Sequence, residues 1–303
     1  MKISVQIPTH NRKDLLRRSL EALFKTDFPA SDYELVLVDD GGADGTGDMV
    51  KAMNAPCRVK YLYQEKSGAA AARNLGIKNA DGEVILFIDD DIFADRDLLK
   101  EHWASHQEYP RAVIMGRVNH IESLDEDPEA KYKLADFSTS FFWTSNASVR
   151  KRFLEEAGLF AEEFTEYGWE DPEFGFRLRA IGLVRKYNQR ALVHHFKSRW
   201  KASDVPRLCR QAQSSGRSAV IFLRKHPCLR TRLSTGIFAL RFAWDRVLRL
   251  GRGLYTSSVK RSGDCPLSGF ALLSARTLVS FEYFDSVRSS LSARNTNVGE
   301  HQQ

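Results

Sequence analysis

An apolar run at residues 84–88 leads directly into three consecutive aspartates, Asp89, Asp90 and Asp91. The run has the length and the β-branched content of a buried strand. Adjacent carboxylates disfavour one another's ionisation, so this triplet does not stabilise a fold by itself. A divalent cation that prefers oxygen ligands, Mn²⁺ or Mg²⁺, would relieve the repulsion. The alternative is a solvated acidic turn that only ends the strand.

Segments with strand-like and helix-like patterns alternate along the first part of the chain. Strands are expected at residues 3–7, 33–38, 59–63, 84–88 and 112–115. Helices are expected at residues 12–25, 46–53, 68–79, 97–108, 150–157 and 170–181. Alternation of this kind predicts an α/β fold, with a Rossmann-like, mostly parallel sheet flanked by helices.

The composition is that of an ordinary globular protein, with 43% hydrophobic and 28% charged residues. The four cysteines are scattered without a CxxC pair, which indicates free thiols in a reducing compartment. The first residues already form a strand pattern, which leaves no room for a signal peptide. No window of 18 residues is apolar and uncharged, so no membrane-spanning helix is expected. These features predict a cytoplasmic protein.

The charge is uneven, although the net value is only +6. Between residues 199 and 261 there are 15 Lys and Arg against only Asp204 and Asp245. Residues 1–200 are therefore expected to form one region, and residues 201–303 a second, basic helical region. Residues 237–252 interleave arginines with apolar side chains, as helices at membrane interfaces do. An anionic membrane surface is one expected partner, with the protein peripheral on the inner face. The alternative is an ordinary packed helix, and no nucleic acid is expected.

Two more predicted strands end in polar residues. Residues 3–7 run into PTHNR at 8–12, and residues 33–38 run into DDG at 39–41. The carboxyl ends of parallel strands share one edge of a sheet, where ligands bind. The chain has neither a GxxxxGK[ST] loop nor a GxGxxG after its first strand. Gly68 and Arg73, at the start of a predicted helix, are therefore expected to help a cation hold phosphates.

These motifs together resemble the inverting family-2 glycosyltransferases of the GT-A fold, over roughly residues 1–200. The resemblance is carried by IPTHNR at 7–12, VDDGGADGT at 38–46, ARNLGI at 72–77 and FIDDD at 87–91. Gly42 stands where the family often has Ser, which puts only a minor capping contact in doubt. The resemblance implies a nucleotide-diphosphate sugar as donor, a UDP-sugar first of all, and a glycan or lipid-linked saccharide as acceptor.

The resemblance also implies roles for single residues. Asp39 would accept a hydrogen bond from the nucleobase, Asp89 would face the ribose, and Asp91 would bind the metal. The residues expected at the nucleotide are Pro8, Thr9, Asn11, Arg12, Asp39, Gly68, Arg73, Asp89 and Asp90. His195 is expected as a further metal ligand, with His194 as the alternative. Asn146 is expected in a strand, in contact with the donor sugar.

A second acidic cluster begins with Glu170 and Asp171, and Pro172 and Glu173 follow. Acidic residues at the start of a helix stabilise it, and Glu173 is assigned to that structural role. The resemblance implies that Glu170 and Asp171 form the acceptor-side motif, with Asp171 as general base. An acceptor hydroxyl is a poor nucleophile until a carboxylate takes its proton. Trp169 is expected to stack on a sugar ring, with core packing as the alternative.

Two other classes of protein remain open at this point. A DxD after an apolar strand also resembles haloacid-dehalogenase-type phosphatases, although Phe93 stands where those usually carry Thr or Val. A non-catalytic nucleotide-sugar-binding protein is the other alternative. The pair Glu170 and Asp171 disfavours it, because binding alone needs no base.

Overall fold

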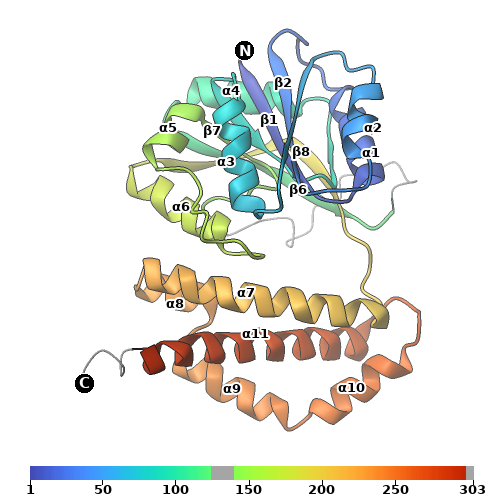
Figure 1. Cartoon of the computed structure of the whole chain (residues 1–303), viewed down its shortest axis with the longest axis vertical. Helices are drawn as coiled ribbons and strands as arrows, with labels where there is room; N and C mark the ends of the chain where they lie inside the picture. The colour runs from blue at the N-terminus through green and yellow to red at the C-terminus, as the bar shows by residue number, and fades with distance from the viewer. Residues whose placement is uncertain (124–139, 298–303) are drawn as a thin grey trace. The chain divides into compact units, whose positions relative to one another are not determined.

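The structure is a computed structural model, and it describes residues 1–123 and 140–297. The chain forms two compact units (Figure 1). Met1–Thr165 and Glu170–Ser198 form the α/β unit, and Glu166–Trp169 and Arg199–Gln303 form the helical unit. The functional division expected at residue 200 stays a prediction.

The α/β unit is built on one eight-stranded sheet with the order β3-β2-β1-β4-β7-β6-β8-β5. Its strands are β1 (Ile3–Thr9), β2 (Tyr33–Asp40), β3 (Arg58–Gln64), β4 (Val84–Phe87), β5 (Ile92–Ala94), β6 (Ala112–Ile121), β7 (Ala147–Arg150) and β8 (Val184–Phe196). The first four strands pair in parallel. Strand β7 is antiparallel to both β4 and β6, and β5 is antiparallel to β8. The sheet is therefore mixed in the half that follows β4.

Helices cover both faces of this sheet. They are α1 (Lys13–Leu23), α2 (Thr46–Ala52), α3 (Ala69–Asn79), α4 (Leu98–Glu108), α5 (Lys151–Glu156) and α6 (Glu170–Ala180). Successive strand residues enter different cores: Leu35 and Leu37 pack with the leucines of α1, whereas Val36 packs with α3. In Figure 1, α1 and α2 lie on one side of the sheet and α3, α5 and α6 on the other. The period of two in the strands therefore confirms the expected α/β architecture.

Strands β5 and β8 were not predicted from the sequence. Strand β5 has only three residues, too few for a recognisable pattern. Strand β8 alternates poorly because its first half is exposed and polar. Asn146 was expected in a strand but directly precedes β7, and His195 lies within β8.

The helical unit packs around two long helices. It contains a 3₁₀ turn (Ala202–Asp204) and the helices α7 (Val205–Lys225), α8 (Leu229–Thr235), α9 (Ala239–Arg249), α10 (Arg252–Arg261) and α11 (Gly269–Asn297). Helices α7 and α11 run side by side (Figure 1). Gly216 allows their close approach, because a Cβ there would lie 2.6 Å from the carbonyl oxygen of Tyr283. Over the described residues, no helix combines the length and the apolar composition needed to cross a membrane.

Candidate active site

The carboxyl ends of β1, β2 and β4 meet at one edge of the sheet, as predicted. Thr9 stands opposite Asp39 in the pairing of β1 with β2. Thr9 Oγ1 donates a 2.9 Å hydrogen bond to Asp90 Oδ2, which ties the end of β1 to the aspartate triplet. The parallel register therefore gathers polar residues that are separated by up to 81 positions in the chain.

Arg12 binds two of the three aspartates. Its guanidinium donates to Asp90 at 2.6 Å and to Asp91 at 2.9 Å. Asp90 is 4% exposed. Burial raises its pKa to about 7, against the opposing effect of the Arg12 charge. Arg12 and Asp90 were both predicted to bind the nucleotide. In the structure, Thr9 and Arg12 both donate hydrogen bonds to the Asp90 carboxylate. This geometry favours a structural role for Asp90.

The loop after β1 is hydrogen-bonded to the loop after β2. Asn11 has a positive φ of 52° and accepts the backbone N–H of Ala43 at 2.7 Å. Asp39 accepts the N–H of Gly42 and the hydroxyl of Tyr61, both at 2.8 Å. These bonds fix the Asp39 carboxylate at the sheet edge.

Asp40 has a role that was not predicted from the sequence. Its carboxylate accepts the backbone N–H groups of Ser67 at 2.7 Å and of Gly68 at 3.0 Å, just before α3. Gly68 has a φ of 94°, and a Cβ there would lie 2.8 Å from the carbonyl oxygen of Thr165. Only glycine fits that conformation and that space without strain. Successive side chains of a strand point in opposite directions. The adjacency of Asp39 and Asp40 in the sequence could therefore have indicated that the two residues have separate roles.

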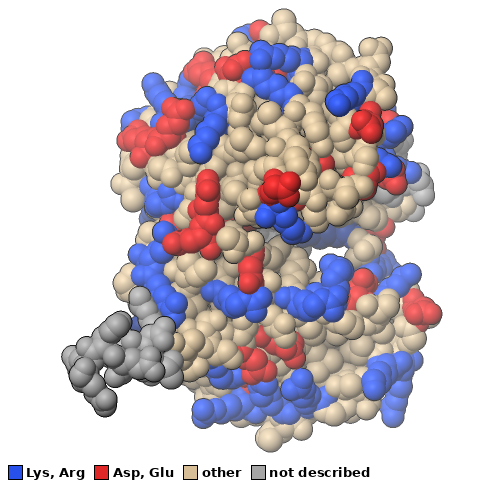
Figure 2. Space-filling view, viewed as in Figure 1, with Lys and Arg blue, Asp and Glu red and all other residues tan. Residues whose placement is uncertain are grey.

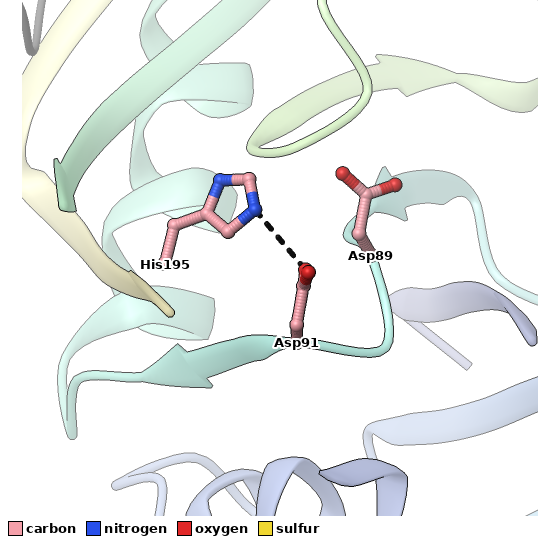
Figure 3. A group of neighbouring side chains, drawn as sticks. All are labelled: Asp89, Asp91 and His195. Atoms are coloured by element: carbon pink, nitrogen blue, oxygen red, sulfur yellow. Dashed lines mark ion pairs between the residues drawn. The ribbon is translucent and has the colours of Figure 1, made fainter. Parts of the chain in front are cut away.

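Three side chains form a candidate metal site. One ligand atom each from Asp89, Asp91 and His195 lies within 4.8 Å of the others, and the side chains converge on a common space (Figure 3). His195 Nε2 is 3.2 Å from Asp91 Oδ1. Ser145 Oγ donates to Asp89 Oδ2 at 2.7 Å. Burial disfavours the charged form of Asp91, but His195 and Arg12 lower its pKa below the ordinary value.

The neighbouring histidine is directed elsewhere. His194 Nδ1 lies 3.0 Å from the side-chain nitrogen of Asn119. Successive residues of a strand point to opposite faces, so only His195 of this pair in β8 faces Asp91. The structure therefore separates the two histidines that the sequence left as alternatives.

Arg73 connects the metal cluster to the second acidic motif. This buried side chain of α3 donates to Glu170 Oε1 at 3.0 Å and to Thr144 Oγ1 at 2.7 Å. It also lies 3.6 Å from carboxylate oxygens of both Asp89 and Asp171. Burial alone would lower the pKa of Arg73, but these carboxylates raise it well above the ordinary value. Arg73 is therefore a permanent positive charge between the two motifs.

Asp171 lies in the first turn of α6 and is held by Thr144. Its Oδ2 accepts the N–H of Thr144 at 2.9 Å and the Oγ1 hydroxyl at 2.7 Å. Burial raises the pKa of Asp171 above its ordinary value, against the charge of Arg73. Asp171 Oδ1 and Glu170 Oε2 are both buried and have no hydrogen bond within the described part of the chain. An unsatisfied buried carboxylate oxygen is costly, and the charge of Arg73, 3.6 Å from Asp171 Oδ1, offsets part of that cost.

Glu173 has the structural environment expected of it. Its side chain is fully buried and pairs with Arg177 one turn later in α6, at 2.8 Å.

Asn146 lies in the interior, where the geometry argues against the predicted contact with a sugar. Its Oδ1 lies 2.8 Å from His102 Nε2, and its Nδ2 donates to the carbonyl oxygens of Arg117 and Ala191. The side chain is fully buried, so its amide supports the junction of β6, β7 and α4.

Trp169 belongs to the helical unit and is partly buried. Its Nε1 donates to Ser215 Oγ at 3.1 Å, and its ring stacks on Phe222 with 5.9 Å between centroids. Trp169 has a φ of 73°, a conformation that is uncommon for a bulky residue. Its stacking on a sugar stays a prediction.

The sequence matches a known protein family. The model of glycosyl transferase family 2 matches residues 4–157, about half of the chain. The chain therefore belongs to glycosyl transferase family 2, as the motifs predicted.

The chain is also similar to curated relatives. It is 30% identical over 219 residues to validoxylamine A glucosyltransferase of Streptomyces hygroscopicus subsp. jinggangensis, covering 60% of this chain and 52% of the relative. It is 26% identical over 250 residues to the chondroitin synthase of Escherichia coli, covering 68% of this chain and 36% of the relative. The chain thus spans about half the length, or less, of these relatives.

Solved structures share the fold. The mannosyltransferase PcManGT of Pyrobaculum calidifontis, in complex with GDP-Man and Mn²⁺, has a TM-score of 0.62 at 18% identity, over 96% of this chain and 87% of that one. Staphylococcus aureus TarS 1–349, in complex with UDP-GlcNAc, has a TM-score of 0.56 at 20% identity, over 97% and 92%. These likenesses confirm the predicted GT-A fold.

Proposed function

We propose that this protein transfers a sugar, with inversion, from a nucleotide-diphosphate donor to an acceptor hydroxyl. The observation that carries the proposal is the position of Arg73, which pairs at once with Asp89 and with Glu170. A donor site and an acceptor site must adjoin for a single displacement at the anomeric carbon. The buried guanidinium brings the residues proposed for each site within a few ångströms.

The donor side would use the sheet edge. Asp39 and Pro8 would receive the nucleobase and Thr9 would line the ribose pocket, as family membership implies. A UDP-sugar is the first expected donor, and the TarS structure holds UDP-GlcNAc. The PcManGT structure holds GDP-Man, so the nucleobase of the donor has to be determined by experiment.

The residues at the candidate metal site fit a divalent cation. Asp91 Oδ1 is buried and lies 3.2 Å from His195 Nε2, so two potential ligand atoms from different parts of the chain point into the same space. Asp89 and Asp91 would supply oxygens and His195 a nitrogen, and the imidazole favours Mn²⁺ over Mg²⁺. A cation bound there would neutralise charge on the departing diphosphate.

On the acceptor side, Asp171 would act as general base. Thr144 fixes one of its oxygens and leaves Oδ1 for the acceptor hydroxyl. Arg73 keeps enough of the carboxylate ionised to take a proton, although burial favours the neutral form. The neighbouring Glu170 Oε2 would accept a second acceptor hydroxyl. The acceptor class we propose is a glycan or a lipid-linked saccharide.

We further propose an anionic membrane surface as a partner of the helical unit. Five large apolar side chains on or next to α9 and α10 are each at least 55% exposed: Leu240, Trp244, Val247, Leu250 and Leu254. Three of them follow the spacing i, i+4, i+7 of a single helix face. Basic side chains are frequent around this apolar surface, and Figure 2 shows Lys and Arg spread over the helical unit. Such a combination is typical of interfacial helices.

The test is a thermal-shift panel of UDP, GDP, dTDP and their sugars, with Mn²⁺ or with EDTA, followed by an assay of donor hydrolysis. We expect one nucleotide to stabilise the protein in Mn²⁺ and its sugar to be hydrolysed slowly. Asp97→Asn, an exposed change in the α/β unit, serves as the control variant. Binding without any turnover, with or without candidate acceptors, would favour the non-catalytic alternative. No binding to any nucleotide would refute the donor assignment.

A further inference from the structure

The helical unit contains a pocket of about 630 Å³, a volume typical of small-ligand sites. Its wall is formed by α7, α8, α9 and α11 together with Tyr167 and Trp169. Aromatic rings make up much of this wall: Trp169, Trp200, Phe238, Tyr283 and Phe284. All of these residues belong to the helical unit, so the pocket lies within one unit.

The polar atoms of two of these rings are already occupied. Trp169 Nε1 donates to Ser215, and the Tyr283 hydroxyl donates to the carbonyl oxygen of Thr235 at 2.7 Å. These rings therefore offer carbon surface to an occupant instead of hydrogen-bond donors. That chemistry selects an apolar group.

Two arginines that line the pocket, Arg241 and Arg276, have no carboxylate partner among the described residues. Arg241 lies over the ring of Phe284 and reaches Ser280 only at 3.5 Å, and Arg276 is exposed. Neither forms an ion pair in the described part of the chain, whereas other arginines of the unit do. The paired ones include Arg217, Arg249, Arg252 and Arg288. Two uncompensated guanidinium groups beside an apolar wall form a site for an anionic group.

We infer that this pocket binds an anionic amphiphile, a molecule with an apolar chain and an adjacent phosphate or carboxylate. The apolar chain lies against Trp169, Trp200 and Phe284, and Arg241 and Arg276 bind the anionic group.

The test measures binding of decyl phosphate by isothermal titration, below its micelle concentration and without donor. Decyl maltoside is the uncharged analogue, and inorganic phosphate lacks the chain. We expect decyl phosphate to bind more tightly than either. Arg241→Gln and Arg276→Gln should each weaken it about tenfold, as for a lost charge-assisted hydrogen bond. Ala212→Phe, which fills the pocket, should abolish binding.

Two matched variants serve as controls. Arg246→Gln removes an exposed charge from the same helix as Arg241, and Ala243→Phe adds a ring on the exposed side of α9. Both should leave the affinity unchanged. Equal losses in Arg246→Gln and Arg241→Gln would show binding to a basic surface and overturn the inference, as would full affinity in Ala212→Phe. UDP binding is measured on the same variants, so failure of the pocket is distinguishable from failure of the donor site.

Discussion

Arg73 Nη1 donates a 3.0 Å hydrogen bond to Glu170 Oε1 across 97 residues of chain. The same guanidinium lies 3.6 Å from Asp89, so one buried cation stabilises two acidic motifs that would otherwise repel each other. Because its pKa is raised, the charge of Arg73 persists at any pH where the protein is folded.

Replacing Arg73 should destabilise the fold in a pH-dependent way. Arg73→Gln leaves Glu170 and Asp171 buried without a cation, a loss of about 3–5 kcal/mol at pH 8. The folded-state pKa of Asp171, which burial already raises, then rises further, so the folded state binds more protons than the unfolded chain. The deficit should shrink as the pH falls from 8 to 5. Urea unfolding at several pH values measures it. The exposed change Arg207→Gln should have little effect, and a pH-independent deficit would contradict the explanation.

Asp171→Asn should remove transfer but keep the donor. Loss of a general base costs about 10² to 10⁴ in rate, and the amide can still pair with Thr144. Turnover of the donor that binds in the thermal-shift panel gives the first readout, and UDP affinity gives the second. The variant Asp97→Asn should match the wild type in both. Retained turnover in Asp171→Asn would exclude the base role.

The acid limb of the activity profile should report on Asp171. Burial raises its pKa to about 6, and only the ionised form accepts a proton. We therefore expect kcat/KM to rise about tenfold per pH unit up to that pKa and then level off. Thr144→Val removes a hydrogen bond to the ionised carboxylate, so it should move the limb to higher pH. Thr256→Val in α10 serves as a control, and an unmoved limb in Thr144→Val would count against the assignment.

The two adjacent histidines provide a matched pair for the metal. His195→Gln should weaken Mn²⁺-dependent UDP binding about tenfold or more, because it removes the imidazole nitrogen that lies 3.2 Å from Asp91 Oδ1. His194→Gln, which changes the residue beside Asn119, should leave the Mn²⁺ dependence intact. Titration of UDP with Mn²⁺ and with EDTA gives both values. Equal effects of the two variants would remove His195 from the ligand set.

The exposed apolar surface on α9 and α10 should govern membrane binding. The double variant Leu240→Glu and Trp244→Glu should abolish co-sedimentation with vesicles that contain phosphatidylglycerol. Both side chains are more than half exposed, so the fold should be unaffected. Tyr63→Glu changes an equally exposed aromatic residue in the α/β unit and is the control. If the wild-type protein ignores anionic and neutral vesicles alike, the membrane proposal is wrong.

Much of the α/β unit was predictable because its signals are local. The strands β1, β2 and β4 each carry a continuous apolar run, and polar residues mark their ends. Parallel strands share an edge, so the strand pattern alone was enough to place Thr9, Asp39 and Asp91 near one another. Strands β5 and β8 were not predicted, because short or half-exposed strands are defined by the strands they pair with rather than by their own sequence pattern.

The candidate site was predictable in its parts but not in its contacts. Asn146 shows why: it precedes β7 among alternating residues, yet it is buried because His102 and two carbonyl groups satisfy its amide. Burial of a polar side chain depends on partners distant in the chain. The same holds for Arg12, a residue expected at the nucleotide, whose pairing with Asp90 could not be read from the sequence.

The sequence by itself determined the acidic triplet, the strand before it and the family to which the chain belongs. Those properties depend on neighbouring residues and on motif spacing. Only the tertiary structure decided which aspartate pairs with His195, which with Arg12, and how Arg73 joins the triplet to Glu170. Like charges in one cluster are separated in function by the cations around them, and folding sets those cations in place.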